Sequence, residues 1–172
     1  MAFIATFAKN YIGMPQKKLY TLTQALEYAK DYCAKEEHCQ SDVKKKLRSY
    51  GVSEEEADIC LAELISEGFI NEQRYADLFA VSKFHQNKWG RNKIAMHLKA
   101  KEISSICIGK ALDKIDVAEY YDTINRLFEK RMPNGKSGAN SLERKKTISF
   151  LIGRGFEYSE ITKALDVSDD DF

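Results

Sequence analysis

Three stretches of this chain repeat one pattern of apolar residues. Positions between Val43 and Leu61 align 51 residues further on with Ile94 to Leu112, and 53 residues beyond these with Thr147 to Leu165. Self-similarity at such a period is typical of stacked supersecondary units, each of which buries its apolar face against its neighbours. Each unit is expected to hold a long first helix, a short second helix, a tight turn and a third helix.

Composition favours helices throughout. Only two prolines occur, Pro15 and Pro133, so almost nothing interrupts a helix between them. The 172 residues suffice for three units of roughly 50 residues, each too small to have a generous core alone. The fold class is therefore predicted as all-α, with three tandem three-helix repeats. The predicted boundaries are an N-terminal extension at 1–20, expected to be partly disordered, repeats at 21–69, 70–115 and 116–166, and an acidic tail at 167–172.

Local signals mark several helix ends in the first unit. Gly51 lies just past the expected second helix, where glycine accepts the left-handed conformation that closes a helix. Ser41 is expected to cap the start of that helix. Ser53 and Glu56 have the spacing of a capping box, which opens the third helix.

The middle unit breaks the pattern at its turn. Glu102 stands where the other two units have Gly51 and Gly155. If the middle turn keeps the same backbone, Glu102 has a positive φ, which costs roughly 1–2 kcal/mol. A glycine at this position is therefore expected to raise the stability of the protein.

Four motifs follow one another along the chain. They are Lys46-Leu-x-x-x-Gly51-Val, Leu64-x-x-x-Gly68-Phe-Ile-Asn-Glu-x-x-Tyr-Ala76, Lys88-Trp-Gly90-Arg-x-Lys-Ile-x-x-x-Leu98-x-x-Lys and Phe150-Leu-x-x-Arg-Gly-Phe156-x-x-x-x-Ile161-x-x-Ala-Leu165. Their order and spacing together resemble the RecX family, the regulators of the bacterial recombinase RecA. The resemblance covers residues 22–166. The chain departs from the family at Asn71-Glu72, where an acidic pair is usual, and at Glu102, where a glycine is usual.

The resemblance implies a binding protein and not an enzyme. It implies three tandem three-helix motifs in an elongated, curved array, in agreement with the offsets between the repeated stretches. The implied partner is RecA and its filament on single-stranded DNA. Binding would restrain the ATPase, strand-exchange and co-protease activities of RecA in recombination and DNA repair. Some members of the family also bind DNA, so weak, non-specific DNA binding is a further expectation.

Charge is distributed unevenly along the chain. The net charge is only +1, so the whole chain does not indicate a nucleic-acid binder. Carboxylates dominate from Glu54 to Asp77, whereas the stretch from Lys83 to Lys101 holds cations and no acid. Such a protein can present a basic face to phosphates and an acidic face to a protein partner. The candidate DNA- or RecA-binding residues are Lys83, Lys88, Trp89, Arg91, Lys93, Lys99, Lys101, Arg144, Lys145, Lys146 and Arg154.

Each of these candidates also has a simpler interpretation. Lys88, Arg91 and Lys93 are the strongest, because they lie near the expected start of a helix, where phosphate contacts are favoured. Charge runs on helices are, however, usually solvated faces. Trp89 could stack on a base or anchor in a partner, but the favoured interpretation is that it fills the junction between two helices. Arg154 could contact RecA or DNA, or be a solvated cation at a helix end.

Motifs for catalysis are missing from the sequence. It has no G-x-x-x-x-G-K-S/T loop, no H-E-x-x-H and no G-x-S-x-G. A metal site built from Cys33, His38 and Cys39 is conceivable, but their spacing matches no zinc pattern. No catalytic residue, cofactor or metal site is therefore predicted.

The sequence also indicates where the protein is located and leaves two alternative functions open. The four cysteines form no C-x-x-C pair and indicate reduced thiols in a cytoplasmic protein. No stretch has the length and apolarity of a membrane span, and a monomer is expected. A helix-turn-helix regulator that reads one DNA sequence stays open, since two helices joined by a glycine turn also describe that motif. A generic helical adaptor for proteins is the second alternative.

Overall fold

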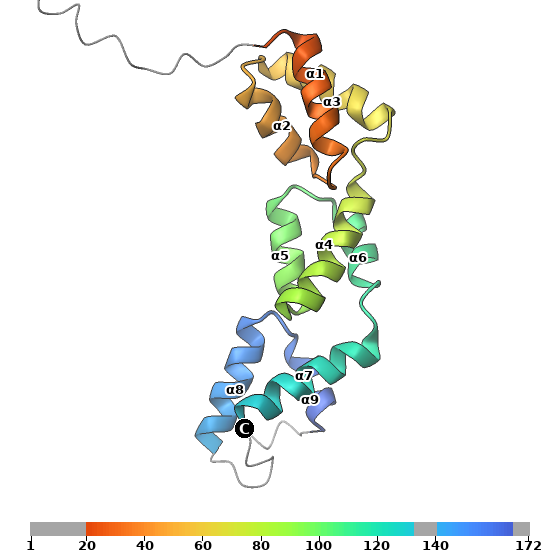
Figure 1. Cartoon of the computed structure of the whole chain (residues 1–172). Helices are drawn as coiled ribbons and strands as arrows, with labels where there is room; N and C mark the ends of the chain where they lie inside the picture. Colours follow the sequence, from red (N-terminus) through yellow and green to blue (C-terminus); the bar gives the residue numbers. More distant parts are fainter. Residues whose placement is uncertain (1–19, 133–140, 167–172) are drawn as a thin grey trace, which may run out of the picture.

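The computed structural model describes residues 20–132 and 141–166, and every regular element in these ranges is a helix (Figure 1). The expectations for residues 1–19 and for the tail at 167–172 lie outside the described residues. The helices are α1 (Leu22–Cys33), α2 (Gln40–Ser49), α3 (Glu54–Ser66), α4 (Glu72–Asn87), α5 (Arg91–Ala100), α6 (Ser105–Leu112), α7 (Val117–Arg131), α8 (Ser141–Gly153) and α9 (Tyr158–Leu165).

The helices follow one another in threes, which confirms the predicted all-α fold of tandem three-helix repeats. Figure 1 shows α1–α3, α4–α6 and α7–α9 stacked into an elongated, curved array, and we call these groups repeats 1, 2 and 3. The residue limits assigned to each repeat stay predictions. The expected long first helix is wrong for repeat 1, where α1 has 12 residues and α3 has 13.

Two apolar cores hold the array together. Repeat 1 has a core of its own, which includes Ala25, Leu47 and Leu64. Repeats 2 and 3 share a second core, in which Phe84 of α4 and Tyr120 of α7 belong to one continuous cluster. Burial of this apolar surface is the main favourable contribution to folding. The division between the cores therefore falls near the junction of repeats 1 and 2, where Cys39 of repeat 1 belongs to the core of repeats 2 and 3.

Glycine turns and one cap lie where the sequence predicts them. Gly51 and Gly155 follow α2 and α8 with φ values of 94° and 91°, in the region that glycine adopts without strain. Ser53 and Glu56 form the capping box at the start of α3, with hydrogen bonds in both directions. These signals are local, so the sequence around each helix end is enough to predict them.

The expectation that Ser41 caps α2 is wrong. The N-cap is Cys39, which makes no side-chain capping bond, and Ser41 lies inside the first turn of the helix. The hydroxyl of Ser41 donates to the carbonyl of Lys101 in repeat 2, at 3.2 Å. The Ser41 hydroxyl, which was predicted to cap its own helix, therefore forms a contact with the next repeat.

Repeats 2 and 3 meet through backbone. The second helix of repeat 2 begins on the turn between α8 and α9, where the Gly90 N–H donates to the Arg154 carbonyl at 2.9 Å. The Asn92 N–H donates to the Gly155 carbonyl at 3.0 Å. A Cβ atom on Gly90 would lie only 2.2 Å from the carbonyl carbon of Gly155. The two backbones are therefore in contact, and neither glycine has room for a side chain.

The equivalent junction between repeats 1 and 2 is made by side chains. Ser41 reaches the Lys101 carbonyl, and the Lys101 ammonium pairs with Asp42 at 2.6 Å. A hollow of about 100 Å³ lies at this junction. Cys39 and Glu102 occupy the repeat positions of the two glycines, so the backbones do not approach as closely.

Replacement of Glu102 with glycine is expected to stabilise the protein by about 1 kcal/mol. Glu102 has the predicted positive φ, 64°, and its side chain is exposed. Glycine adopts this backbone without the clash between Cβ and carbonyl that a larger residue suffers. Thermal and urea unfolding followed by circular dichroism would measure the gain. An unchanged or lower melting temperature would show that the left-handed turn carries no such strain.

Candidate functional site

Part of the predicted basic surface comes together where α4 turns into α5. Lys88 ends α4 in the left-handed conformation, with φ 52° and ψ 48°. The N–H of Trp89 then donates back to the Lys83 carbonyl at 3.3 Å, which closes the helix. Lys93 follows in the first turn of α5. We call Lys83, Lys88, Trp89 and Lys93 the basic corner.

The Trp89 ring lies at the centre of the basic corner. It stacks on His97 of α5, with 4.5 Å between ring centroids. The ammonium groups of Lys93 and Lys83 lie 4.9 Å and 5.8 Å from the indole centroid. Cations at these distances over an aromatic ring are attracted by its electron-rich face. Trp89 thus packs between α4 and α5, as the simpler interpretation expects, and it also gathers the two lysines around it.

The lysines of the basic corner carry uncompensated charge. Within the described ranges, Lys83, Lys88 and Lys93 form no ion pair with a carboxylate. All three side chains are partly exposed. Cations with this exposure attract anions at a distance of about one Debye length, roughly 10 Å. The corner is therefore suited to contact with phosphates.

Arg91 has a different role from the one that its place in the sequence suggests. Its guanidinium lies over the Tyr120 ring, 4.2 Å from the centroid, and donates to the Ile115 carbonyl at 3.4 Å. The backbone N–H of Arg91 donates to the Tyr120 hydroxyl at 3.0 Å, and this hydroxyl donates to Glu157 at 2.5 Å. Arg91 thus joins α5 to repeat 3 and lies outside the basic corner.

Most amide groups at the start of α5 are engaged within the protein. Gly90 and Asn92 donate to the α8–α9 turn, and Arg91 donates to Tyr120. Anion binding at a helix start depends on such N–H groups pointing at the ligand. The expected helix-start contribution stays a prediction, and the lysine side chains are the stronger candidates for this role.

Two other candidate residues, Arg154 and Lys101, form contacts between neighbouring repeats. The Arg154 guanidinium donates to the Asn87 carbonyl at 2.5 Å and lies 5.2 Å from the centre of the Phe150 ring. The hydrogen bond from Lys101 to Asp42 raises the pKa of the lysine, although burial opposes this effect. Burial alone would raise the pKa of Asp42, but the hydrogen bonds from Lys101 and Cys39 hold it below its usual value. Both cations thus form contacts between repeats.

The remaining candidates lie outside the basic corner. Lys99 is exposed near the far end of α5, while Lys145 and Lys146 are exposed on α8. Along α8, these two residues stand about 13 Å before Arg154, at 1.5 Å per residue. The side chain of Arg144 is only partly exposed. The structure therefore brings together the α4–α5 part of the predicted surface, with Arg154 beside it, and leaves the α8 part separate.

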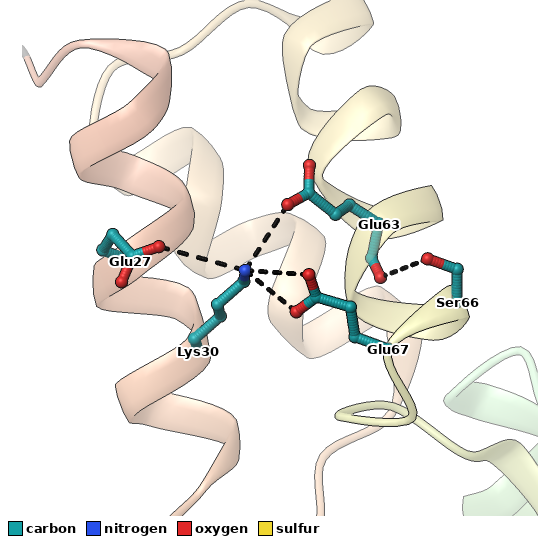
Figure 2. Close-up of polar contacts among 5 residues, drawn as sticks. All are labelled: Glu27, Lys30, Glu63, Ser66 and Glu67. Carbon is teal, nitrogen blue, oxygen red and sulfur yellow. Dashed lines mark hydrogen bonds and ion pairs between the residues drawn. The ribbon is translucent and has the colours of Figure 1, made fainter.

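Repeat 1 neutralises much of its own charge. Figure 2 shows the Lys30 ammonium of α1 among Glu27 and two α3 carboxylates, with Glu63 at 3.4 Å and Glu67 at 2.8 Å. The hydrogen bond to Glu67 is the largest of the effects that raise the pKa of Lys30. On α2, Lys44 pairs with two further carboxylates of α3. The acidic stretch in the sequence is therefore compensated in part by lysines of α1 and α2.

Neither a metal-binding cluster nor a membrane-spanning helix is found among the described residues. No three His, Cys, Asp or Glu residues gather as metal ligands within 20–132 and 141–166. His38 stacks on Tyr32, with ring centroids 3.8 Å apart, and Cys33 and Cys39 are free thiols. Burial raises the pKa of the Cys33 thiol. None of the described helices has the length and apolar character needed to cross a membrane.

Models of known families match two of the three repeats. The second three-helix domain of RecX matches residues 71–112, and the third three-helix domain of RecX matches residues 118–165. The regulatory protein RecX of Pseudomonas fluorescens is 30% identical over 156 residues, which cover 89% of this chain and 97% of the relative. The regulatory protein RecX of Ralstonia nicotianae is 22% identical over 158 residues, which cover 92% and 94%.

Solved structures show the same fold. A crystal structure of RecX from Lactobacillus salivarius superposes with a TM-score of 0.75 at 22% identity, covering 84% of this chain and 96% of the other. A second crystal structure of a regulatory protein RecX gives a TM-score of 0.75 at 21% identity, with coverages of 84% and 71%. With the two matching domains and the relative at 30% identity, these likenesses show that the chain belongs to the RecX family.

Proposed function

We propose that this protein binds RecA and its filament on single-stranded DNA and thereby lowers the ATPase, strand-exchange and co-protease activities of RecA. It acts as a cytoplasmic monomer without catalysis or cofactor. Membership of a family of regulatory proteins supports the assignment to RecA. Weak, salt-sensitive DNA contacts through the basic corner add to the protein contacts with the filament.

One observation carries the DNA part of the proposal: Lys83 and Lys93 lie over one indole ring, Lys88 precedes that tryptophan in the chain, and none of the three lysines pairs with a carboxylate of the described residues. Lysines that neutralise phosphates release condensed counterions, and this release makes binding salt-dependent and insensitive to sequence. Elsewhere in repeat 2, Lys101 is paired with Asp42 and Arg91 is engaged by Tyr120. Repeat 2 also exposes Lys99, Lys110 and Lys114, so the basic corner is distinguished by the two lysines over Trp89 and not by charge alone.

The proposed function is tested by titrating the full-length protein into the cognate RecA on single-stranded DNA. DNA-dependent ATP hydrolysis and strand exchange are expected to fall as the protein approaches stoichiometric amounts. Unchanged ATP hydrolysis and unchanged strand exchange at these amounts would overturn the proposal.

Removal of charge from the basic corner is expected to weaken DNA binding about tenfold at 0.1 M salt. In the double variant Lys88→Gln/Lys93→Gln, two phosphate contacts disappear, so the slope of log affinity against log salt decreases by about 1.4 for a single strand. Fluorescence anisotropy with labelled oligo(dT) at several salt concentrations measures both values, and inhibition of RecA should weaken in parallel.

The matched control for this variant is Lys110→Gln/Lys114→Gln. It removes the same charge from exposed positions at α6 and the turn that follows it. Equal losses in the two double variants would mean that net charge, and not the basic corner, governs binding. Circular dichroism of both variants should match that of the parent protein.

Anisotropy measurements with duplexes of different sequence, together with the RecA titration, separate the alternatives. A helix-turn-helix regulator would bind one duplex sequence far more tightly than others, typically by a factor of 10³ or more. A generic protein adaptor would have no DNA affinity and no effect on RecA. The proposal here expects weak binding with little sequence preference.

A further inference from the structure

One face of α4 borders an open groove beside repeat 1. Positions separated by three or four residues along this helix share a face. The volume of the groove is about 310 Å³. Its lining residues are Glu36, Glu37, Tyr75, Leu78, Phe79, Ser82 and Lys83.

The floor of the groove is apolar and uncovered. Leu78 is 55% exposed, although α4 buries Ala76, Ala80 and Phe84 on its other side. Tyr75 and Phe79 are half-buried beside Leu78, with their ring centroids 5.9 Å apart. An apolar concavity between aromatic side chains on a helix is the kind of surface that accepts a large side chain of another protein.

The two ends of the groove differ in charge. At one end, Oε1 of Glu37 accepts a hydrogen bond from Arg74 at 2.5 Å, while its Oε2 is buried and has no hydrogen-bond partner among the described residues. Glu36 lies next to it and is exposed. The buried oxygen cannot be reached from outside, so Glu36 is the carboxylate that a cationic donor of a partner can contact. Lys83 lies at the other end, 5.4 Å from the Phe79 ring centre.

We infer that this groove binds a protein segment that carries a large apolar side chain next to an arginine or lysine. The apolar side chain covers Leu78, and the cation pairs with the exposed carboxylate of Glu36. The inference rests on the proposed function, because it assigns the segment to the surface of a RecA subunit. It adds a protein-binding site next to the phosphate-binding lysines, with Lys83 shared between the two.

The position of the groove fits a partner made of protein and DNA. Tyr75 near one end of the groove and Lys88 in the basic corner are about 20 Å apart along α4, at 1.5 Å per residue. Lys83 belongs to both the groove and the corner. A RecA filament presents protein surface and DNA phosphates together, so one helix can contact both components.

The test uses the full-length protein with a single substitution at an exposed position. Leu78→Asp is expected to weaken binding to RecA filaments on oligo(dT) about tenfold, because it places a charge on the apolar floor. Glu36→Gln, which removes the exposed charge at this end of the groove, is expected to weaken binding about threefold. Binding to oligo(dT) without RecA should stay unchanged in both variants, as should their melting temperatures.

Ile106→Asp is the matched control, because Ile106 on α6 is 70% exposed and lies outside the groove. It should bind filaments as the parent does. If the parent binds filaments and Leu78→Asp binds them equally well, the groove is not the docking site, while the proposed function stands. If the parent itself does not bind filaments, the proposed function fails and the inference fails with it. Tighter binding by Leu78→Asp would assign the groove to a segment of this chain that competes with RecA, and would also overturn the inference.

Discussion

Replacement of Gly90 with alanine is expected to destabilise the protein by about 3 kcal/mol or more. The new Cβ would lie 2.2 Å from both the Gly155 carbonyl carbon and the Phe156 nitrogen. These are backbone atoms, so the α8–α9 turn must move away from α5 and lose the hydrogen bonds from Gly90 and Asn92. Overpacking of this kind costs 1–3 kcal/mol, and the two lost hydrogen bonds add to the cost.

Gly109→Ala is the control for this substitution. Gly109 lies within α6, is exposed, and has no atom within 4 Å of the position of a new Cβ. Alanine is a better helix former than glycine by up to about 1 kcal/mol, so this variant should be as stable as the parent or more stable. Urea unfolding followed by circular dichroism compares the two. Equal stability of Gly90→Ala and the parent would show that repeats 2 and 3 tolerate separation at this turn.

Local sequence signals predicted the helices and turns well. The capping box at Ser53 and the glycine turns at Gly51 and Gly155 depend only on neighbouring residues. Even the positive φ of Glu102 follows from its alignment with these glycines. The helix start at Ser41 was wrong, because an inter-repeat hydrogen bond uses its hydroxyl. Errors of this kind arise where a polar side chain can serve either its own helix or a neighbouring repeat.

In each turn between the second and third helices, one backbone carbonyl directly precedes the glycine or Glu102. The hydrogen-bond donor to this carbonyl could not be predicted from the sequence. Arg154 accepts from Gly90 at 2.9 Å, and Lys101 accepts from Ser41 at 3.2 Å. In repeat 1 the same position, Tyr50, accepts from the Tyr20 N–H at 3.1 Å. The equivalent carbonyl needs a hydrogen-bond donor in all three repeats, but the donor is a different group each time. No residue pattern in the sequence therefore identifies the donor.

The candidate site was predicted only in part, because charge in a sequence does not reveal its partner. Lys83 and Lys93 do gather over the Trp89 ring, next to Lys88 in the chain. Arg91 is as basic and as near to the turn, yet it contacts an aromatic ring of repeat 3. The sequence places Arg91 and Tyr120 29 residues apart and gives no signal that they meet. Residues that hold repeats together are therefore of the same types as the residues proposed to contact DNA.

Tyr120 is the centre of the contact that Arg91 makes. It is fully buried, lies 5.1 Å from the Phe156 ring centroid and is part of the core shared by repeats 2 and 3. Its hydroxyl accepts from the Arg91 N–H and donates to Glu157. Burial, and then the Glu157 carboxylate, raise the pKa of Tyr120 well above its ordinary value, so the hydroxyl keeps its proton in the folded state. Removal of this oxygen leaves a backbone donor and a carboxylate without their partner.

At pH 8, Tyr120→Phe is expected to lower the free energy of unfolding by about 2 kcal/mol, because the substitution keeps the ring packing but removes the hydrogen bonds. Above pH 10 the parent loses stability, because Tyr120 ionises in the unfolded chain but stays protonated in the folded one. Phenylalanine cannot ionise, so the difference between parent and variant should shrink by up to about 1.4 kcal/mol per pH unit there. Urea unfolding at pH 8 and pH 11 measures both values.

Tyr121→Phe removes the neighbouring hydroxyl, which donates to Glu160 at 2.8 Å from a partly exposed side chain, and should cost less than Tyr120→Phe. Water can replace the lost partner at Tyr121, whereas it cannot reach the buried oxygen of Tyr120. Equal losses in the two variants, or a pH-independent difference between Tyr120→Phe and the parent, would show that the Tyr120 hydroxyl does not stabilise the junction. In that case the Arg91 guanidinium would hold repeats 2 and 3 together through its ring and carbonyl contacts alone.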